Sequence, residues 1–368
     1  MKTRKIIHIV PNLSGGGVQR RMGLLARYSA FLGNEVHIIF FGYGDNASDV
    51  ELENVTLHKI TKGRVTQIIM VVKILLIIRS IRPDVIHTWS ANMDILGGFI
   101  NVLTGIKWCL MESTSAEHYK KATMKFSVRR MLAKRAVVIS NSKEGDKYWN
   151  NQHIRKRIIQ NGIELDRIKG VEPLPESKLR FIGNDPFICF FGRLNNTATD
   201  VKNLDGCLRV IKSLKENNQP VKLLICGDGN EKTLWIHKVA QYNIQDYVKF
   251  MGYLKRQDVW AFMKSADAVI SLSLHEGTPN VVLEAMAAGC ALIVSDIPSH
   301  RQLLDDKDAL IVAPKSPNDA SKAVATLLSN KGATNARIQS AYRKVQEMNI
   351  HKMIIKYQNL YDEMLDTY

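Results

Sequence analysis

Residues 275–284 read HEGTPNVVLE and contain two carboxylates, Glu276 and Glu284, which are separated by seven residues. An apolar, strand-like run at 267–274 precedes this stretch, and the small-residue run AMAAGCALIV at 285–294 follows it. A strand that passes through a short Gly- and Pro-containing loop into a helix is the repeating unit of an open parallel sheet. The stretch therefore predicts an α/β fold, with both carboxylates near the carboxyl end of a strand.

The same alternation of short apolar runs and helical patterns extends along the whole chain of 368 residues. The predicted strands are 5–10, 35–41, 55–60, 84–88, 107–112, 136–140, 187–191, 222–226, 248–251, 268–272, 291–295 and 309–312. The helical patterns include 18–33, 65–81, 202–217, 230–242, 256–265 and most of 318–368. Strands separated by helices indicate two Rossmann-like domains, each with a doubly wound parallel sheet.

The segment 165–186 interrupts this alternation with a Pro-, Glu-, Lys- and Arg-rich composition, which predicts a connection between domains. We expect an N-terminal domain of residues 1–168, completed by a C-terminal helix at 350–368, and a C-terminal domain of residues 169–349. Ligands of open parallel sheets bind beyond the carboxyl ends of the strands. Loops follow predicted strands at 15–17, 192–202, 227–229 and 275–280. We therefore expect one cleft between two facing domains.

The charge of the chain is unevenly placed. Its formal net charge is +16, and residues 1–180 carry 29 Lys and Arg against 15 Asp and Glu, whereas the remainder carries 22 against 20. A basic N-terminal half indicates an anionic partner, such as a lipid surface, a lipid diphosphate or nucleic acid. The five cysteines show no CxxC spacing, which argues against a zinc site or a disulfide framework and fits a reducing compartment.

The N-terminus does not read as a signal peptide, because its short basic start precedes no long apolar segment. The most apolar run, 68–78, has 11 residues and contains Lys73, so it is too short to span a bilayer. We interpret it as a buried helix on a sheet. The alternative is a helix that also touches a membrane.

The loop within the opening stretch predicts the start of a helix. Thr278 is expected to cap a helix whose first residue is Pro279, since proline is favoured at the first helical position. The amides of Asn280, Val281 and Val282 would then be free donors, and such a helix start binds anions. The sequence therefore predicts an anion site at this loop.

The two carboxylates flank that anion site. Glu276 would lie on the loop and Glu284 about one turn into the helix. Together they could bind hydroxyl groups on either side of a phosphate, which is the layout of a nucleotide-sugar. The alternative is that both are surface charges near a helix start.

Two further loops carry groups suited to phosphate. Arg193 follows the strand 187–191 and Lys202 precedes the next helix, so the two cations could grip a diphosphate. Solvated loop charges are the alternative. The Gly-rich turn 15–17 would let a ligand approach the backbone closely. It is not GxGxxG, and no acidic residue ends the strand 35–41, so a dinucleotide site is weakly supported.

Together these motifs resemble those of the family 4 retaining glycosyltransferases, which have the GT-B fold. The resemblance is carried by GGGVQR at 15–20, NGIE at 161–164, FGRL at 191–194 with Lys202 and Asn203, CGDG at 226–229, and EGTPNVVLEAMAAG at 276–289. These motifs occur in the family's order over nearly the whole chain. The two glutamates separated by seven residues, followed by AMAAG, are the most specific of them.

The resemblance implies a role for each motif residue. Arg193 and Lys202 would neutralise the donor diphosphate, and Glu276 would bind hydroxyls of the donor sugar. Backbone amides of Gly16 and Gly17 would approach the diphosphate from the N-terminal domain, and Glu284 would bind the ribose. The remaining donor-binding residues would be Gly277, Thr278, Pro279, Asn280 and Val281. Transfer would retain the anomeric configuration without a metal or other cofactor, with UDP as the expected carrier and GDP as the alternative.

The acceptor side departs from the family pattern. Many members carry a His just after the strand that corresponds to 107–112, whereas here the first His is His118. His118 is expected to take the catalytic role on the acceptor side, or Glu112 contacts the acceptor instead. The alternative for His118 is an ordinary surface histidine.

A basic cluster with interleaved apolar residues follows at 120–135. At helical spacing Lys121, Lys125 and Arg129 could share one face, and Arg130 belongs to a second. The segment is similar to a membrane-surface helix, and these residues are expected to contact the acceptor or the membrane. A solvated helix face is the alternative.

We therefore predict a cytoplasmic enzyme, peripheral to the inner face of the plasma membrane, that transfers a sugar from a nucleotide-sugar to a polyprenyl-diphosphate-linked saccharide in cell-surface polysaccharide or glycan biosynthesis. The alternatives are a related enzyme with a soluble acceptor, a nucleic-acid-binding protein and a dinucleotide dehydrogenase. The basic cluster argues against the first. A nucleic-acid-binding protein would leave Glu276 and Glu284 unexplained, and in or next to the basic cluster only Tyr119 and Phe126 could stack on bases. The missing fingerprint argues against the third.

Overall fold

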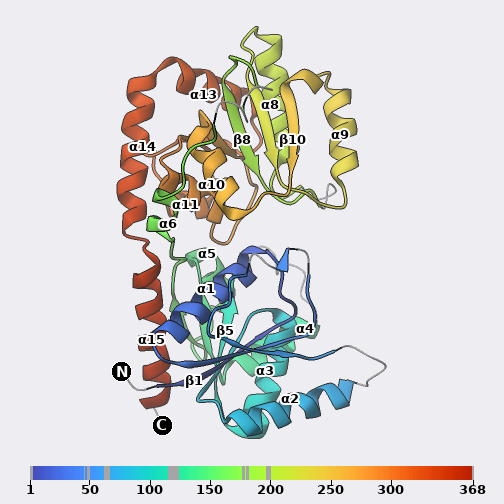
Figure 1. Ribbon diagram of the computed structural model, residues 1–368, viewed down its shortest axis with the longest axis vertical. Coiled ribbons are helices and arrows are strands. Elements are labelled where there is room, and N and C mark those ends of the chain that lie inside the picture. Colours follow the sequence, from blue (N-terminus) through green and yellow to red (C-terminus); the bar gives the residue numbers. More distant parts are fainter. Residues whose placement is uncertain are drawn as a thin grey trace. The chain divides into compact units, whose positions relative to one another are not determined.

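The computed structural model of the protein describes residues 3–44, 46–47, 50–61, 67–114, 124–175, 179, 182–195 and 200–366 (Figure 1). The chain forms two compact units, of which unit 1 is Met1–Gly162 with Ile350–Tyr368 and unit 2 is Ile163–Asn349. The division lies earlier than residue 168, because the segment predicted as a linker already contributes to unit 2. Its helix α6 (Leu165–Lys169) buries Ile168 in the core of that unit.

Unit 1 is built on a parallel sheet. In the described residues its strands are β1 (Lys5–Val10), β2 (Glu35–Phe40), β3 (Thr56–Lys59), β4 (Val85–Thr88), β5 (Lys107–Glu112), β6 (Val137–Ser140) and β7 (Arg155–Ile158). Their order in the sheet is β3-β2-β1-β4-β5-β6-β7. The central strands are almost continuously apolar because helices cover both faces of the sheet, as in doubly wound folds.

The helices of unit 1 divide between those two faces. The elements are α1 (Gly17–Phe31), α2 (Gln67–Ile81), α3 (Ala91–Thr104), α4 (Met124–Ala133), α5 (Lys143–Asp146), η3 (Lys147–Trp149) and α15 (Ile350–Asp366). Helices α1 and α15 share one hydrophobic core with the sheet, and α2, α3 and α4 share the other. Figure 1 shows α2, α3 and α4 on the side of this sheet away from α15. The C-terminal helix therefore completes unit 1.

Unit 2 repeats the architecture with a second parallel sheet. Its strands in the described residues are β8 (Phe187–Phe191), β9 (Lys222–Cys226), β10 (Val248–Gly252), β11 (Ala268–Ser271), β12 (Leu292–Ser295) and β13 (Leu310–Val312), in the order β10-β9-β8-β11-β12-β13. Besides α6, its helices are α8 (Leu204–Glu216), α9 (Lys232–Gln241), η4 (Gln245–Tyr247), α10 (Arg256–Ser265), α11 (Asn280–Ala288), α12 (Pro298–Arg301), α13 (Pro317–Ser329) and α14 (Lys331–Gln346). The prediction of two parallel α/β domains is confirmed.

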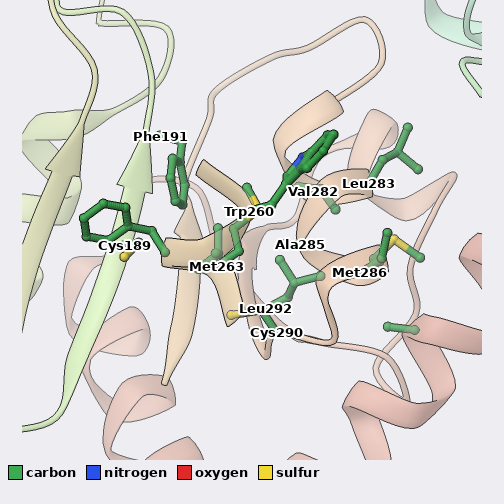
Figure 2. Close-up of a cluster of buried hydrophobic side chains, with 14 of the residues drawn as sticks. Cys189, Phe191, Trp260, Met263, Val282, Leu283, Ala285, Met286, Cys290 and Leu292 are labelled. Carbon is green, nitrogen blue, oxygen red and sulfur yellow. The ribbon is translucent and has the colours of Figure 1, made fainter. Parts of the chain in front are cut away.

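A tight hydrophobic cluster fixes the helix that carries the opening stretch. Figure 2 shows Val282, Ala285 and Met286 of α11 among side chains of α10 and β8, with Trp260 and Phe191 beside them. All of these side chains are buried. A close-packed interior leaves little room for a helix to shift. This packing therefore fixes the position of α11 and of Glu284, which the helix carries.

Strand β7 and helix α3 of unit 1 are among the elements that were not named from the sequence. Strand β7 has the sequence RKRI, whose charges conceal a strand. Among the described strands it pairs only with β6, and basic residues on such an edge strand discourage pairing with other chains. Helix α3 contains adjacent glycines, Gly97 and Gly98, which are poor helix formers. A Cβ on Gly97 would lie 2.8 Å from Nε1 of Trp108, so Gly97 lets α3 approach the sheet closely.

Candidate functional site

The strand order of unit 2 reverses between β8 and β11. In open parallel sheets, ligands bind outside the carboxyl ends of the strands at such a point. The loops that leave this edge are tied together by backbone hydrogen bonds. The Gly192 amide donates to the Cys226 carbonyl at 3.1 Å, and the Leu274 amide donates to the Val201 carbonyl at 2.8 Å. The described parts of the predicted loop 192–202 (192–195 and 200–202) therefore share one edge of unit 2 with the loops at 227–229 and 275–280.

The loop after β9 needs glycine because of this close approach. Gly227 has a φ of +153°, and a Cβ there would lie 1.8 Å from the carbonyl oxygen of Gly192. Any side chain at this position would push apart the loops that follow β8 and β9.

Lys202 and Glu276 form an ion pair at this edge, between the Lys202 ammonium and Oε1 of Glu276. The Ser273 hydroxyl donates to the same oxygen at 2.8 Å. The side chain of Lys202 is 39% exposed and that of Glu276 is 14% exposed, so the pair is open to a ligand. Two residues predicted to hold the phosphate and the sugar are thus adjacent, and their charges neutralise each other.

A buried histidine supports the loop that carries Glu276. Nδ1 of His300 lies 2.8 Å from the carbonyl oxygen of Ser295, which can only accept, so Nδ1 carries the proton of the neutral ring. The Ser295 hydroxyl donates in turn to the Ser273 carbonyl. Burial lowers the pKa of His300, which keeps the ring uncharged beneath the Lys202 and Glu276 pair.

Helix α11 begins one residue later than the sequence predicts. Pro279 is the capping residue and Asn280 is the first helical residue. The Val282 amide donates to the Pro279 carbonyl at 3.1 Å, so the prediction that Val282 offers a free donor is wrong. The tight first turn uses that amide internally. Thr278 and Gly277 precede the cap, and both are partly exposed.

Glu284 has partners that differ from those of Glu276. Its carboxylate lies 3.5 Å from the Arg256 guanidinium, which also contacts Glu164 at 3.1 Å. The Arg256 guanidinium lies 4.9 Å from the ring centre of Trp260. These contacts fix Glu284, whose side chain is 11% exposed, on the first turns of α11. Glu276 and Glu284 therefore lie in different surroundings, because Glu276 is paired with Lys202 and Glu284 with Arg256. This argues against a general acid and base that act as a pair.

Arg193 and Asn203 complete the edge in opposite ways. The Arg193 side chain is exposed, and no hydrogen bond or ion pair ties it to another of the residues that the structure describes. Asn203 has a φ of +54°, caps α8, and donates to the carbonyls of Leu272 and Pro314. Asn203 thereby fixes the backbone beside Lys202, and the Arg193 side chain is exposed to solvent.

In unit 1 the predicted glycines lie at the corresponding edge. The strand order reverses between β1 and β4, and Gly16 caps α1 while Gly17 is its first residue. The Arg20 amide donates to the Gly16 carbonyl at 2.9 Å, as expected for the first turn of a helix. Contact of Gly16 and Gly17 with a diphosphate stays a prediction. His118 and Lys121 lie outside the described residues.

The acceptor or membrane role predicted for Arg129 is wrong, because Arg129 is buried. Its guanidinium donates to Asp94 of α3 at 2.7 Å and to Glu112 of β5 at 2.9 Å. Glu112 also accepts from the Trp149 indole at 3.2 Å and from the Thr114 amide at 2.9 Å. With both oxygens engaged inside the unit, Glu112 braces the end of β5 and offers no direct contact to an acceptor.

Burial also changes the pKa of Asp94, which forms a buried cluster with Arg129 and Glu112. Desolvation raises the pKa of Asp94 to about 6, although the nearby Arg129 charge and a hydrogen bond from Thr88 act in the other direction. The cluster of Asp94, Arg129 and Glu112 is therefore a structural network of unit 1. By contrast, Lys125 and Arg130 are exposed on α4, as the prediction requires.

Sequence reasoning missed Ser273, Arg256 and His300, which hold the two glutamates in place. None of them carries a motif signal, because each acts through a contact that the fold creates. In the described residues, no group of three or more His, Cys, Asp or Glu side chains is placed to hold a metal ion.

Comparison with known proteins identifies both units. Residues 15–167 match the family described as Glycosyltransferase Family 4, and residues 175–345 match Glycosyl transferases group 1. An uncharacterized glycosyltransferase of Methanocaldococcus jannaschii is 28% identical over 61% of this chain and 58% of its own length. The N-acetylgalactosamine-N,N'-diacetylbacillosaminyl-diphospho-undecaprenol 4-alpha-N-acetylgalactosaminyltransferase of Campylobacter jejuni is 25% identical over 61% of this chain and 58% of its own.

The matched region spans less than three fifths of the length of these curated relatives. Among solved structures, Anabaena HepE in complex with UDP is similar with a TM-score of 0.82 and 16% identity, over 98% of this chain and 100% of that one. The likeness establishes a shared GT-B fold.

Proposed function

Because the chain belongs to the glycosyltransferases of family 4, with a C-terminal domain of the group 1 type, we propose that it transfers a sugar from a nucleotide-sugar to a saccharide acceptor. The observation that carries the proposal is the pairing of Lys202 with Glu276 where the strand order of unit 2 reverses. A sugar diphosphate places a double anion beside a set of hydroxyls. A cation beside a hydrogen-bond acceptor is the complementary arrangement.

In this proposal the donor replaces the internal ion pair. The diphosphate takes over the Lys202 ammonium, the exposed Arg193 adds a second cation, and the start of α11 supplies backbone donors. Glu276, released from Lys202, accepts from hydroxyls of the donor sugar, and Glu284 accepts from the ribose. UDP as the carrier is supported by the similarity to HepE, which was solved with UDP.

The reaction proposed for this site is a transfer with retention of configuration. The bond between the anomeric carbon and the diphosphate oxygen breaks, and the acceptor hydroxyl attacks from the same face. Its proton passes to the departing diphosphate. Lys202 and Arg193 stabilise the negative charge that develops on the leaving group, which is electrostatic preorganisation and requires no metal ion.

The acceptor that we propose is a saccharide on a polyprenyl diphosphate at the cytoplasmic face of a membrane, within polysaccharide or glycan biosynthesis. Two observations support it. The Campylobacter jejuni relative is named for a diphospho-undecaprenol-linked saccharide. Unit 1 carries 27 Lys and Arg against 14 Asp and Glu, a balance that suits an anionic acceptor and an anionic surface.

The test of this function is the Glu276→Ala variant, assayed for transfer and for UDP binding. Transfer should fall about 100-fold to 1,000-fold, the usual cost of one hydrogen-bonding group aimed at the reacting centre. UDP should bind no more weakly than to the wild type, because the substitution frees Lys202 from its internal partner. Full activity in Glu276→Ala would contradict the site. The Glu216→Ala variant, which alters a glutamate at the end of α8, serves as the control.

The Glu284→Ala variant separates the two carboxylates. Loss of a ribose contact should raise the KM for the nucleotide-sugar and leave kcat nearly unchanged, since that contact is made equally in the ground and transition states. If Glu284→Ala lowers kcat as much as Glu276→Ala does, the assignment of ribose to Glu284 is wrong.

Thermal unfolding with added nucleotides identifies the carrier. UDP should raise the melting temperature of the protein, because a ligand that binds only the folded state stabilises it. A shift with GDP and none with UDP would make GDP the carrier instead of UDP. No shift with either nucleotide would contradict a nucleotide-sugar site.

A further inference from the structure

One face of unit 1 is formed by three consecutive helices, α2, α3 and α4, which share a hydrophobic core against the sheet. Helix α3 packs closely on α4, where a Cβ on Gly98 would lie 2.8 Å from the Leu132 side chain. The outward sides of these helices form what we name the α2–α3–α4 surface. Its exposed apolar and charged side chains are Ile69, Val72, Lys73, Leu76, Arg79, Phe99, Val102, Leu103, Met124, Lys125, Arg130, Met131, Lys134 and Arg135, the last two directly after α4.

This surface concentrates exposed apolar side chains. Of the seventeen large hydrophobic side chains that are exposed in the described residues, eight lie on these three helices. On α3, Leu103 is 66% exposed and Phe99 is 52% exposed, and on α4 Met124 is 85% exposed. A helix on the surface of a soluble domain normally turns polar residues outward. Helices α2 and α3 instead turn apolar residues both to the core and outward.

The charges on the surface are all of one sign. Asp94 is the only acidic residue in the three helices, and Arg129 holds it inside the unit. The exposed charged residues are Lys73, Arg79, Lys125, Arg130, Lys134 and Arg135. The surface therefore combines apolar side chains with cations and no exposed acidic side chain on its helices.

We propose that the α2–α3–α4 surface docks the protein onto an anionic lipid bilayer. Apolar side chains such as Leu103 and Phe99 would enter the boundary between headgroups and acyl chains. Lysines and arginines around them would contact anionic headgroups, as on amphipathic helices that lie in a membrane interface. In the described part of the chain, no helix combines the length and the apolarity that are needed to cross a membrane.

Charge favours a bilayer over a second copy of the chain. A two-fold dimer through this surface would bring the same cations of both copies together, with no exposed acidic side chain on the helices to pair with them. Nucleic acid would satisfy the cations, but only Phe99 among the exposed apolar residues of these helices could stack on a base. A lipid surface is the partner that suits both the charges and the apolar side chains.

The experiment is co-sedimentation with vesicles, without any nucleotide or acceptor present. The wild type should bind vesicles of mixed phosphatidylglycerol and phosphatidylcholine, and binding should weaken with added salt and with phosphatidylcholine alone. The variant Arg130→Gln/Lys134→Gln should bind the mixed vesicles about 25-fold more weakly, taking about fivefold for each cation. The variant Phe99→Asn/Leu103→Asn should also bind the mixed vesicles more weakly than the wild type. Its loss of affinity relative to the wild type should be the same at low and at high salt, because the substitutions remove apolar contacts and no charge.

Matched controls use the opposite face of unit 1. Lys352→Gln/Lys356→Gln on α15 makes the same change in net charge, and Phe31→Asn removes an exposed aromatic side chain from α1. Both should bind vesicles as the wild type does. Because the mutated side chains are exposed, each variant should keep the melting temperature of the wild type to within a small shift.

Equal loss of binding in the α15 control would show that net charge alone drives the interaction, and would overturn the assignment of this surface. A wild type that sediments as a dimer, becomes monomeric in Phe99→Asn/Leu103→Asn and ignores vesicles would also overturn it. The inference draws its biological purpose from the proposed function, but the two can fail separately. Vesicle binding without a thermal shift from either UDP or GDP would contradict only the function. A nucleotide-induced shift without vesicle binding would contradict only the docking surface.

Discussion

A cluster of ion pairs in unit 1 and an ion pair in unit 2 both join a cation to carboxylates, but they stand in different surroundings. In unit 1 Arg129 joins Asp94 and Glu112, and all three side chains are buried. In unit 2 Lys202 joins Glu276 at the carboxyl edge of the sheet, where the lysine is partly exposed. A buried charge cannot leave its partner without a large desolvation cost, whereas a partly exposed charge can exchange its partner for a ligand. Burial therefore separates charges that hold the fold from charges that are available for binding.

The same contrast appears between neighbours on one helix. Arg129 and Arg130 are adjacent in the sequence, yet Arg129 is buried and Arg130 is exposed over the Tyr148 ring, 5.5 Å from its centre. Unit 1 carries 27 Lys and Arg against 14 Asp and Glu, and unit 2 carries 24 against 21. The net charge of a unit thus says little about which of its charges meet a partner outside.

The largest expected effect is on the stability of unit 1. Arg129→Ala leaves the carboxylates of Asp94 and Glu112 buried without their cation, and it should lower the free energy of unfolding by about 3–5 kcal/mol. Arg130→Ala is the matched control and should change it by less than about 0.5 kcal/mol. Urea unfolding of both variants measures the difference. Similar losses in the two variants would break the distinction between buried and exposed charges.

The next effect is on catalysis by unit 2. Lys202→Ala should lower kcat/KM about 100-fold to 1,000-fold, or about 2.7–4 kcal/mol, because the cation that offsets the leaving diphosphate is lost. Stability should change by no more than about 1 kcal/mol, since the pair with Glu276 is partly exposed. Steady-state kinetics and thermal unfolding measure the two quantities. A variant that unfolds easily but retains kcat/KM would assign Lys202 to the fold instead of the site.

A smaller effect concerns pH. Burial raises the pKa of Asp94 to about 6 in the folded protein, so between its unfolded value near 3.8 and that pH the folded state holds a proton that the unfolded state releases. The stability from this proton is complete below pH 4 and is lost as the pH rises through 6. The free energy of unfolding of the wild type, minus that of Asp94→Asn, should therefore fall by about 1–3 kcal/mol from pH 4 to pH 7.

Titrating groups that do not interact with Asp94 are common to both proteins and cancel in that difference. The groups that face Asp94 are Arg129, Glu112 and the Thr88 hydroxyl, and Arg129 keeps its charge throughout the range. A difference that rises with pH would mean that the attraction of Arg129 outweighs the cost of burial.

The last prediction is that removing divalent cations has no effect on the transfer rate. Removal of divalent cations with EDTA should leave the transfer rate unchanged, because Lys202 and Arg193 are proposed to supply the positive charge that the diphosphate needs. Transfer assays with and without EDTA, and with added Mg²⁺, measure this. Strict dependence on Mg²⁺ would contradict the proposed mechanism and would make the unit 2 cations secondary.

Local patterns predicted much of the fold. Apolar runs of five or six residues matched strands such as β1 and β8, and α10 has the predicted bounds. Strand β7 was missed because an edge strand has no need of apolar residues on both faces, and its RKRI sequence reads as a charged loop. The start of α11 was predicted one residue early, because Pro279 caps the helix instead of opening it.

The sequence by itself determined the two α/β domains, the loops at the strand ends and the resemblance built on the two glutamates of HEGTPNVVLE. Only the tertiary structure decided which charges meet. Lys202 and Glu276 are 74 residues apart in the chain, and strand order brings them together. Arg129 and Arg130 are adjacent in the chain, and packing against β5 separates their roles. Periodicity is a property of neighbouring residues, whereas burial and ion pairing depend on elements that the chain brings together from far apart, so neither can be read from spacing alone.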